Sequence, residues 1–188
     1  MEYNGCVGFG PEKAGRKRVC RGMKVVLPGA ESALLEKLAH GGVFLTTGGE
    51  KPNTMTIGWG SIGVYWYMDV MTVCVRPQRF THDILETNPE FTVSVPVKND
   101  CKEQLAFAGR MSGRDVDKFS GHGITAVAGR KVGTPIVGEC GLHFECKVKM
   151  KTEMDNMDQA VLDRWYPERD LHTLYFAEIV DCYYTEEE

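Results

Sequence analysis

The stretch that decides the fold is NTMTIGWGS, residues 53–61, because small and large side chains alternate along it. Successive side chains of an extended strand point to opposite faces. Every second position from Thr54 to Gly60 holds only threonine or glycine, and the positions between them carry mostly larger side chains. We therefore expect a strand with one bare face, against which either another piece of protein or a planar ligand could lie.

The rest of the chain predicts short strands and short helices that do not alternate regularly. The predicted helices cover residues 31–40, 81–88, 101–111 and 158–165, and the predicted strands cover 43–47, 53–61, 70–76, 91–97, 139–151 and 172–184. A doubly wound parallel sheet would need each strand to be followed by a helix. The sequence therefore predicts an α+β, β-rich, barrel-like fold with short peripheral helices.

Domain organisation follows from length and local composition. A chain of 188 residues with 43% hydrophobic residues suits a single domain. Residues 1–22 are basic and rich in glycine, so we expect a flexible N-terminal extension followed by one domain over residues 23–188. Residues 10–17 come close to a phosphate-binding P-loop, but they lack its lysine, its serine or threonine and a preceding strand.

Charge, hydropathy and cysteine content exclude several classes of protein. The formal net charge of -4 argues against a nucleic-acid binder, which would normally be basic. No run approaches the roughly 18 apolar residues of a membrane span, and the N-terminus lacks the pattern of a secretory signal. Seven cysteines without paired spacing favour a reducing compartment. We therefore expect a cytoplasmic protein that binds neither nucleic acid nor membrane.

The segment from Cys140 to Cys146 raises the question of a zinc site, because it also contains His143. On a regular strand the two cysteines share one face and His143 lies on the other, so the three cannot hold one ion. We expect two buried core cysteines and no metal site. His143 is expected on a polar face, open to solvent, a partner subunit or a ligand.

An anion site is possible where the strand ending at Arg76 is followed by Arg79 and a helix that begins at Thr81. A helix N-terminus offers unpaired N–H groups and the positive end of the helix dipole. Arg79 and the Thr81 hydroxyl would add donors. The alternative is an ordinary helix start with solvated arginines. Lys118 adds a cation on the loop 112–119, where the alternative is a solvated charged turn.

Four segments in this order and spacing resemble one known family. The segments 53–61, 73–81, 91–94 and 112–119 are similar to the flavin reductase-like, flavoredoxin-type family, and the similarity continues through 134–140 and 143–146. It covers roughly residue 23 to the C-terminus. The resemblance implies an FMN-binding split β-barrel that works as a homodimer, with the flavin at the subunit interface.

The resemblance also implies a set of cofactor-binding residues and no catalytic acid or base. The residues expected beside the isoalloxazine are Asn53, Thr54, Met55, Thr56 and Trp59, and those expected to contact the flavin at the end of the third strand are Cys74, Val75 and Arg76. Arg79 and Thr81 would hold the phosphate, with Lys118 reaching the flavin or its phosphate. His143 and Phe176 correspond to positions near the ring. Since Asn53 and Trp59 cannot share a face with Thr56 in a regular strand, we expect either an irregularity near Gly58 or a flavin at the end and edge of the strand.

The implied function is an FMN-dependent oxidoreductase of flavin reductase or flavoredoxin type, which passes electrons from NAD(P)H or a redox partner through FMN. One alternative is an FMN-binding electron carrier that does not oxidise NAD(P)H directly. Another is a barrel without flavin, in which the threonine and glycine face packs against protein. The choice between NADH and NADPH, the final acceptor and the permanence of FMN binding stay open.

Overall fold

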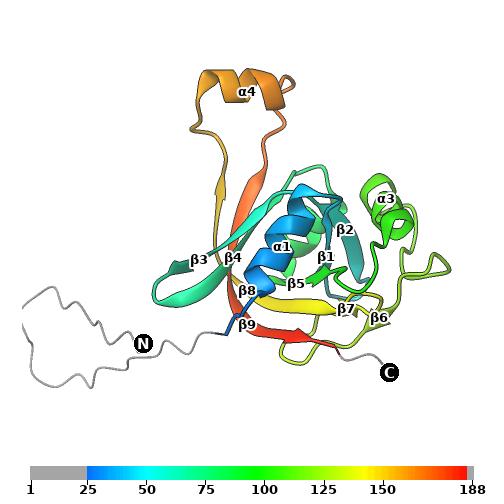
Figure 1. Cartoon of the computed structure of the whole chain (residues 1–188). Helices are drawn as coiled ribbons and strands as arrows, with labels where there is room; N and C mark the ends of the chain where they lie inside the picture. The colour runs from blue at the N-terminus through cyan, green and yellow to red at the C-terminus, as the bar shows by residue number, and fades with distance from the viewer. Residues whose placement is uncertain (1–24, 186–188) are drawn as a thin grey trace, which may run out of the picture.

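The structure, a computed structural model, describes residues 25–185 and contains one seven-stranded sheet (Figure 1). The expected extension over residues 1–22 lies outside the described residues. All pairings in the sheet are antiparallel, in the order β2-β1-β5-β8-β9-β4-β3. The strands are β1 (Val43–Thr47), β2 (Asn53–Ile57), β3 (Gly60–Tyr65), β4 (Met68–Val75), β5 (Glu90–Val95), β8 (Leu142–Glu153) and β9 (Thr173–Tyr184).

Short elements surround this sheet, and the expected α+β, β-rich class is confirmed. The remaining elements are α1 (Ala30–Ala39), α2 (Phe80–Thr87), α3 (Lys102–Arg110), α4 (Gln159–Trp165) and a two-stranded sheet of β6 (Ala126–Val127) and β7 (Ile136–Val137). Strands β2 and β3 form the two edges and do not pair with each other, so the sheet is not closed. Among the described helices, none is long and apolar enough to cross a bilayer.

The stretch 53–61 is two strands rather than one, so the expectation of a continuous strand is wrong. Strand β2 ends at Ile57 and β3 begins at Gly60, and these strands lie at opposite edges of the sheet. Gly58 and Trp59 therefore carry the chain from one edge to the other. At Gly60 a Cβ atom would lie 2.9 Å from the carbonyl oxygen of Thr72 on β4, which explains why glycine stands there. The expected irregularity near Gly58 is this crossing.

The bare face of β2 packs against protein. The Thr56 hydroxyl donates a hydrogen bond to the carbonyl of Leu105 in α3 at 2.6 Å. A Cβ atom at Gly109, also in α3, would lie 3.3 Å from the Thr56 Cβ, so helix and strand are in close contact. Thr54 is fully buried and accepts a hydrogen bond from the Thr46 hydroxyl at 3.0 Å. The small residues thus let α3 approach the strand.

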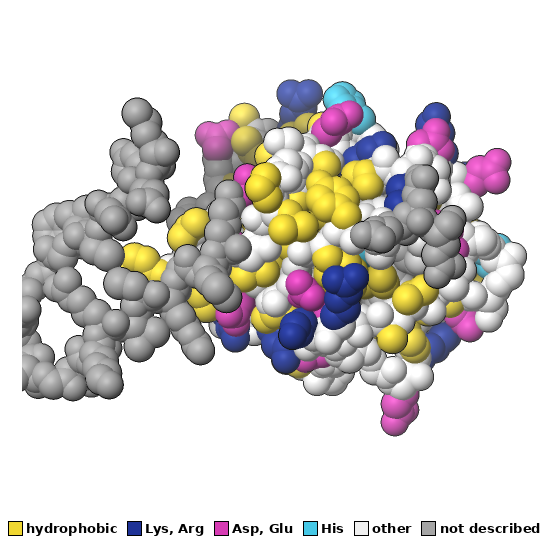
Figure 2. All heavy atoms as spheres, turned by 60° about the horizontal axis from the view of Figure 1, so that its bottom comes forward, with side chains coloured by type: hydrophobic (Ala, Val, Ile, Leu, Met, Phe, Trp, Pro, Cys, Tyr) yellow, Lys and Arg dark blue, Asp and Glu magenta, His cyan; other side chains and the backbone are white. Residues whose placement is uncertain are grey.

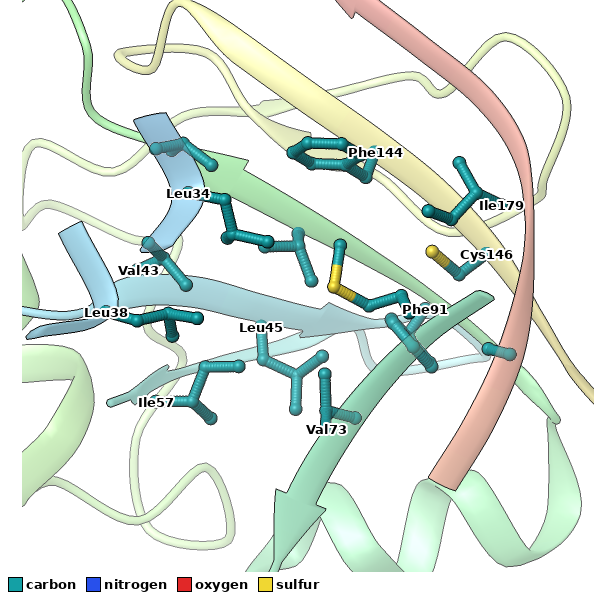
Figure 3. Close-up of a cluster of buried hydrophobic side chains, with 14 of the residues drawn as sticks. Leu34, Leu38, Val43, Leu45, Ile57, Val73, Phe91, Phe144, Cys146 and Ile179 are labelled. Carbon is teal, nitrogen blue, oxygen red and sulfur yellow. The ribbon is translucent and has the colours of Figure 1, made fainter. Parts of the chain in front are cut away.

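The hydrophobic core lies inside the curved sheet and is covered by α1 (Figure 3). Helix α1 buries Leu34 and Leu38, which are four residues apart and share one face. They meet side chains from the strands, including Leu45, Phe91 and Phe144. Each fully buried leucine or phenylalanine stabilises the fold by about 1.5–3 kcal/mol relative to an exposed one.

Strand β8 is buried on both faces in its first half, which corrects the expectation for His143. Residues Leu142 to Cys146 are all buried, because the segment around β6 and β7 covers the face that the alternation assigned to solvent. His143 is fully buried, and its ring nitrogens lie 3.0 Å from the Ser94 hydroxyl and 3.1 Å from the Cys140 carbonyl oxygen. The expected burial of Cys140 and Cys146 is confirmed.

Strands β8 and β9 extend beyond the sheet into an arm, residues 154–172, with α4 at its end (Figure 1). The backbone N–H of Met154 donates to the carbonyl of His172 at 3.0 Å and closes the base of the arm. Helix α4 has no buried residue in the described chain. The arm contacts the body of the protein through the end of α4 and the residues that follow it, since Trp165 and Tyr166 lie against Trp59.

Candidate functional site

A small polar cavity, which we call the cradle, forms where β2, the start of α2 and the loop after α3 meet. It has a volume of about 90 Å³, and its lining includes Asn53, Arg79, Thr81, Gly113 and Lys118. The Asn53 side-chain N–H donates to the Thr81 hydroxyl oxygen at 2.8 Å. Because Thr81 accepts this bond, its own O–H remains a donor for a ligand.

The cradle contains a buried acceptor without a partner. Asn53 is 3% exposed, and its Oδ1 is the one buried side-chain nitrogen or oxygen atom without a hydrogen-bond partner among residues 25–185. Leaving such a group unpaired costs about 1–3 kcal/mol. A Cβ atom at Gly113 would lie 2.1 Å from Asn53 Oδ1, so only glycine leaves room there. Unsatisfied buried polar atoms are rare in folded proteins, so Asn53 Oδ1 is a candidate acceptor for a donor from outside the chain.

Lys118 brings a buried positive charge to the cradle. Its Nζ donates to the carbonyls of Thr54 and Ala108, each at 2.7 Å, and thereby ties the free edge of β2 to the end of α3. Two of the three ammonium N–H groups are used in this way. Burial and the nearby charge of Arg79 lower the pKa of Lys118 to about 8. A bound anion would favour the charged form.

The start of α2 lines the same cavity. The helix begins at Phe80, so Arg79 is the N-cap residue and Thr81 lies in the first turn. Arg79 has an extended backbone, and no side chain caps the helix end. Its own side chain is exposed. Free first-turn N–H groups, a helix dipole and an arginine are what a phosphate group needs.

A second group of residues, the aromatic cluster, lies between the arm and the body of the protein. It contains Trp59, Trp165, Tyr166 and His172. The ring centroid of Trp59 lies 5.0 Å from that of His172 and 5.8 Å from that of Trp165. The Tyr166 hydroxyl lies 2.7 Å from His172 Nδ1. The guanidinium of Arg76 lies 5.3 Å from the Tyr166 ring centroid, within the range of a cation–π contact.

His172 is held neutral within this cluster. Burial, assisted by the positive charge of Arg76, lowers the pKa of His172 to about 4. Arg76 is itself paired with Asp170 at 2.9 Å. The charge of Arg79 lowers the pKa of both His172 and Lys118. Arg79, which lines the cradle, is therefore near the aromatic cluster as well.

The structure brings together most of the residues expected at the site, and it separates others from it. The cradle contains Asn53, Met55, Arg79, Thr81 and Lys118, and the aromatic cluster contains or adjoins Trp59, Cys74 and Arg76. Thr54 and Thr56 face α3, and Val75 is buried in the core. His143 lies in the region covered by β6 and β7. Phe176 contacts Tyr65 on the outer side of the sheet, with ring centroids 5.5 Å apart.

Sequence reasoning missed Tyr166 and His172. A signal for His172 was present, because it begins the last predicted strand, 172–184, while Arg76 ends the third predicted strand, 70–76. In the structure β4 and β9 are antiparallel neighbours, and Val75 pairs with Thr173. This pairing puts the residue before β9 beside the residue after β4. Tyr166 had no such signal, because its place depends on the fold of the arm.

The sequence of the chain is similar to those of several known proteins. Residues 35–188 match the sequence model of the family described as "Flavin reductase like domain". An uncharacterized protein of Archaeoglobus fulgidus is 29% identical over 136 residues, which are 72% of this chain and 67% of that protein. The uncharacterized protein YddH of Escherichia coli is 31% identical over 59% of this chain and 60% of its own length.

Solved structures show the same fold. The flavoredoxin of Desulfovibrio vulgaris (Miyazaki F) aligns with a TM-score of 0.62 and 25% identity, over 77% of this chain and 69% of that one. The flavoredoxin of Methanosarcina acetivorans has a TM-score of 0.61, 25% identity and the same coverage. The NADH:FAD oxidoreductase SgcE6 of Streptomyces globisporus has a TM-score of 0.61 at 22% identity, over 86% and 87% of the two chains. The expected split-barrel fold is confirmed.

Proposed function

The chain belongs to the family of flavin reductase-like domains, and from this premise we propose that it is an FMN-dependent oxidoreductase of flavin reductase or flavoredoxin type. The family and its structural neighbours support a flavin-related redox function. The observation that carries the proposal is the cradle, in which the unpaired Asn53 oxygen lies beside the buried Lys118 and the start of α2. The match spans 56–67% of the length of the curated relatives, so the activity of the whole protein is part of the proposal.

The donor set of the cradle fits a flavin phosphate. Arg79, the Thr81 hydroxyl and the first-turn N–H groups of α2 would hold the phosphate oxygens. Asn53 Oδ1 would accept a hydrogen bond from a hydroxyl or N–H group of the flavin, and Lys118 would add its charge. FMN offers one phosphate to this single cradle, which is why we propose FMN rather than FAD.

The ring of the flavin has to lie outside the cradle. A cavity of about 90 Å³ is far smaller than the roughly 300–1,000 Å³ of a typical ligand pocket. We place the ring towards Trp59, between the cradle and the aromatic cluster. A bound flavin supplies the hydride- and electron-transfer chemistry. The chain contributes orientation, through Trp59 and Arg76, and a neutral His172 that can hydrogen-bond without adding a charge.

We further propose that a second copy of the chain completes the site. Several large hydrophobic side chains are exposed on β3, on its turn and on the outer side of the sheet, among them Tyr65 (45%), Trp66 (54%) and Met150 (39%). Figure 2 shows hydrophobic side chains gathered between charged ones on one face of the molecule. Such open apolar surface is typical of interfaces. A homodimer predicts twice the mass of one chain by light scattering and one FMN per chain.

A second candidate function is an FMN-binding electron carrier that receives electrons from a partner protein. The similarity to two flavoredoxins favours it, and it would use the same residues. Steady-state oxidation of NADH or NADPH in the presence of FMN separates the two candidates.

The five free cysteines among the described residues fit a reducing compartment, so we retain a cytoplasmic location as part of the proposal.

The decisive experiment is reconstitution of the purified protein with FMN. We expect a yellow protein with a flavin spectrum that bleaches when NADH or NADPH is added without oxygen. Arg79→Ala should weaken FMN binding about 10- to 100-fold, because it removes a charged hydrogen-bond donor. Lys149→Ala is the matched control, since Lys149 pairs with Glu178 at 2.9 Å on the outer surface. A protein that stays colourless with FMN, or an Arg79→Ala variant that binds like the control, contradicts the proposal.

A further inference from the structure

Two cysteine side chains meet in a second hydrophobic cluster of the protein. Cys101 directly precedes α3, Cys140 lies between β7 and β8, and both belong to a buried group that includes Phe44, Leu105 and Val137. Each thiol is close enough to the other to shift its pKa. Cys101 is 6% exposed and Cys140 is fully buried. The proposed flavin site uses neither residue.

The two thiols differ in character. The thiol of Cys101 donates to the side-chain oxygen of Asn99, whose N–H donates to the carbonyl of Glu139, the residue before Cys140, at 3.3 Å. The neighbouring Cys140 thiol lowers the pKa of Cys101, whereas the Cys101 thiol and burial raise the pKa of Cys140. The thiolate is the reactive form of cysteine. Cys101 is therefore the residue that reacts first, and Cys140 is the thiol held beside it.

The backbone at Cys101 has an unusual conformation. Its φ is 43°, in the left-handed region that side chains rarely adopt, and it is one of four such non-glycine residues in the described chain. Its carbonyl accepts the first hydrogen bond of α3, from the N–H of Leu105 at 2.8 Å. Strained backbone of this kind concentrates at functional positions.

We propose that Cys101 and Cys140 form a redox-active pair, which a hydroperoxide such as hydrogen peroxide converts into an intramolecular disulfide. The Cys101 thiolate attacks one peroxide oxygen, the O–O bond breaks, and hydroxide leaves as Cys101 becomes a sulfenic acid. The sulfur of Cys140 then attacks the sulfur of Cys101, the S–O bond breaks, and the oxygen leaves as water. In total two thiols and one hydrogen peroxide give one disulfide and two waters.

The disulfide would join the start of α3 to the turn before β8. It would close a loop of about 40 residues, a length at which cross-links stabilise proteins by restricting the unfolded chain. The last turn of α3 supplies the Ala108 carbonyl that holds Lys118. The oxidised protein is therefore expected to melt at a higher temperature than the reduced protein, and a reductant should reverse the change.

Peptide mapping of the full chain tests the proposal. The reduced protein is treated with increasing hydrogen peroxide, the remaining thiols are alkylated, and the chain is digested without reductant. We expect the peptides containing Cys101 and Cys140 to appear linked, with two fewer alkylated thiols per chain, and dithiothreitol to restore both. Alkylation of both residues in separate peptides, or a link from either one to a different cysteine, including Cys6 or Cys20, overturns the proposal.

Two variants sharpen the result. Cys101→Ser should abolish the link and leave Cys140 alkylated. Cys182→Ser is the matched control, because Cys182 and Cys146 belong to the other buried cluster, the main core, and it should leave the yield of the Cys101–Cys140 link unchanged. If Cys101→Ser does not fold, Cys140→Ala takes its place, and the map of the unmutated chain decides by itself. If the yield of the Cys101–Cys140 link falls as far in Cys182→Ser as in Cys101→Ser, the proposal is contradicted.

Discussion

Two buried polar regions of this protein have opposite hydrogen-bonding states. Glu145 is fully buried on β8, and each of its two carboxylate oxygens accepts two hydrogen bonds. Oε1 accepts from the Arg130 N–H at 2.6 Å and from the Tyr183 hydroxyl at 2.8 Å. Oε2 accepts from the N–H groups of Lys131 at 2.6 Å and Val132 at 2.9 Å. Asn53 in the cradle is almost as buried, but its Oδ1 has no partner in the described chain.

The difference separates a structural role from a binding role. Burial alone would raise the pKa of Glu145, but the N–H groups of Arg130 and Lys131 and the Tyr183 hydroxyl bring it below its usual value, so the carboxylate is charged and fixes the loop before β7. In the cradle, burial lowers the pKa of Lys118, and no carboxylate of residues 25–185 raises it again. A saturated cluster contributes to folding, whereas an unsaturated one keeps its donors and acceptors available for a ligand.

The largest expected effect is on the saturated cluster around Glu145. Glu145→Ala leaves three backbone N–H groups and one hydroxyl unpaired in the interior, and it should lower the free energy of unfolding by about 3–5 kcal/mol. Urea denaturation measures this loss. Glu178→Ala, which removes a partly exposed ion pair with Lys149, should cost no more than about 1 kcal/mol. If both variants lose the same free energy of unfolding, Glu145 does not have this structural role.

The next effect is on the unsaturated side and concerns ligand binding more than stability. Gly113→Ala places a Cβ atom where Asn53 Oδ1 lies 2.1 Å away, so the asparagine has to move out of the cradle. We expect FMN binding to weaken about 100-fold, equivalent to about 2.7 kcal/mol. Gly133→Ala is the matched control, since the nearest atom to its Cβ would lie at 3.8 Å. Fluorescence titration with FMN compares the two variants, and equal affinities would contradict a flavin site in the cradle.

A smaller effect is the pH dependence of binding that Lys118 introduces. Its pKa is depressed to about 8, so in the ligand-free protein it loses its proton as the pH rises through this value, and the anion then loses a charged partner. The affinity for FMN should be greatest below about pH 8 and fall by up to about tenfold per pH unit above it.

The same group has the opposite effect on the stability of the ligand-free protein. Between about pH 8 and pH 10.4 the unfolded chain binds more protons at Lys118 than the folded chain does, so stability should rise with pH in this window. Lys118→Met should flatten both profiles, and Lys149→Met should leave both unchanged. A binding profile that is identical in the Lys118→Met variant would show that this lysine does not face the ligand.

How much of the fold the sequence predicts depends on how local the signals are. The helix at 31–40 and most strands follow from alternation, and their bounds are close to those observed. Strand β3 was missed, because its turn to β4 is Trp66-Tyr67, both with positive φ, where asparagine and glycine are usual. The placement of His143 failed for a different reason, because only the tertiary fold brings β6 and β7 over the second face of β8.

The candidate site also combines residues with a local sequence signal and residues that only the tertiary fold brings together. Arg79 and Thr81 were predictable, because a strand followed by arginine and a helix start is a local signal for an anion. The partnership of Asn53 with Thr81 joins positions that are 28 residues apart, and only the folded chain reveals the unpaired oxygen. His172 and Tyr166 depend on the pairing of β9 with β4 and on the fold of the arm. Contacts between distant segments carry the part of the site that local patterns cannot.

The smallest effect compares one hydrogen-bonding side chain from each region. Asn53→Ala removes a single bond, to the Thr81 hydroxyl, since Oδ1 has no partner to lose, and it should lower the stability of the ligand-free protein by only about 1 kcal/mol. Ser94→Ala removes the partner of the Val137 N–H at 3.1 Å and of His143 at 3.0 Å, and should cost about 2 kcal/mol. With saturating FMN the order should reverse, because Asn53→Ala then also loses the bond to the ligand. Thermal unfolding of both variants, with and without FMN, measures the four stabilities. If FMN does not change which variant is the less stable, the Asn53 oxygen is unpaired for a reason other than flavin binding.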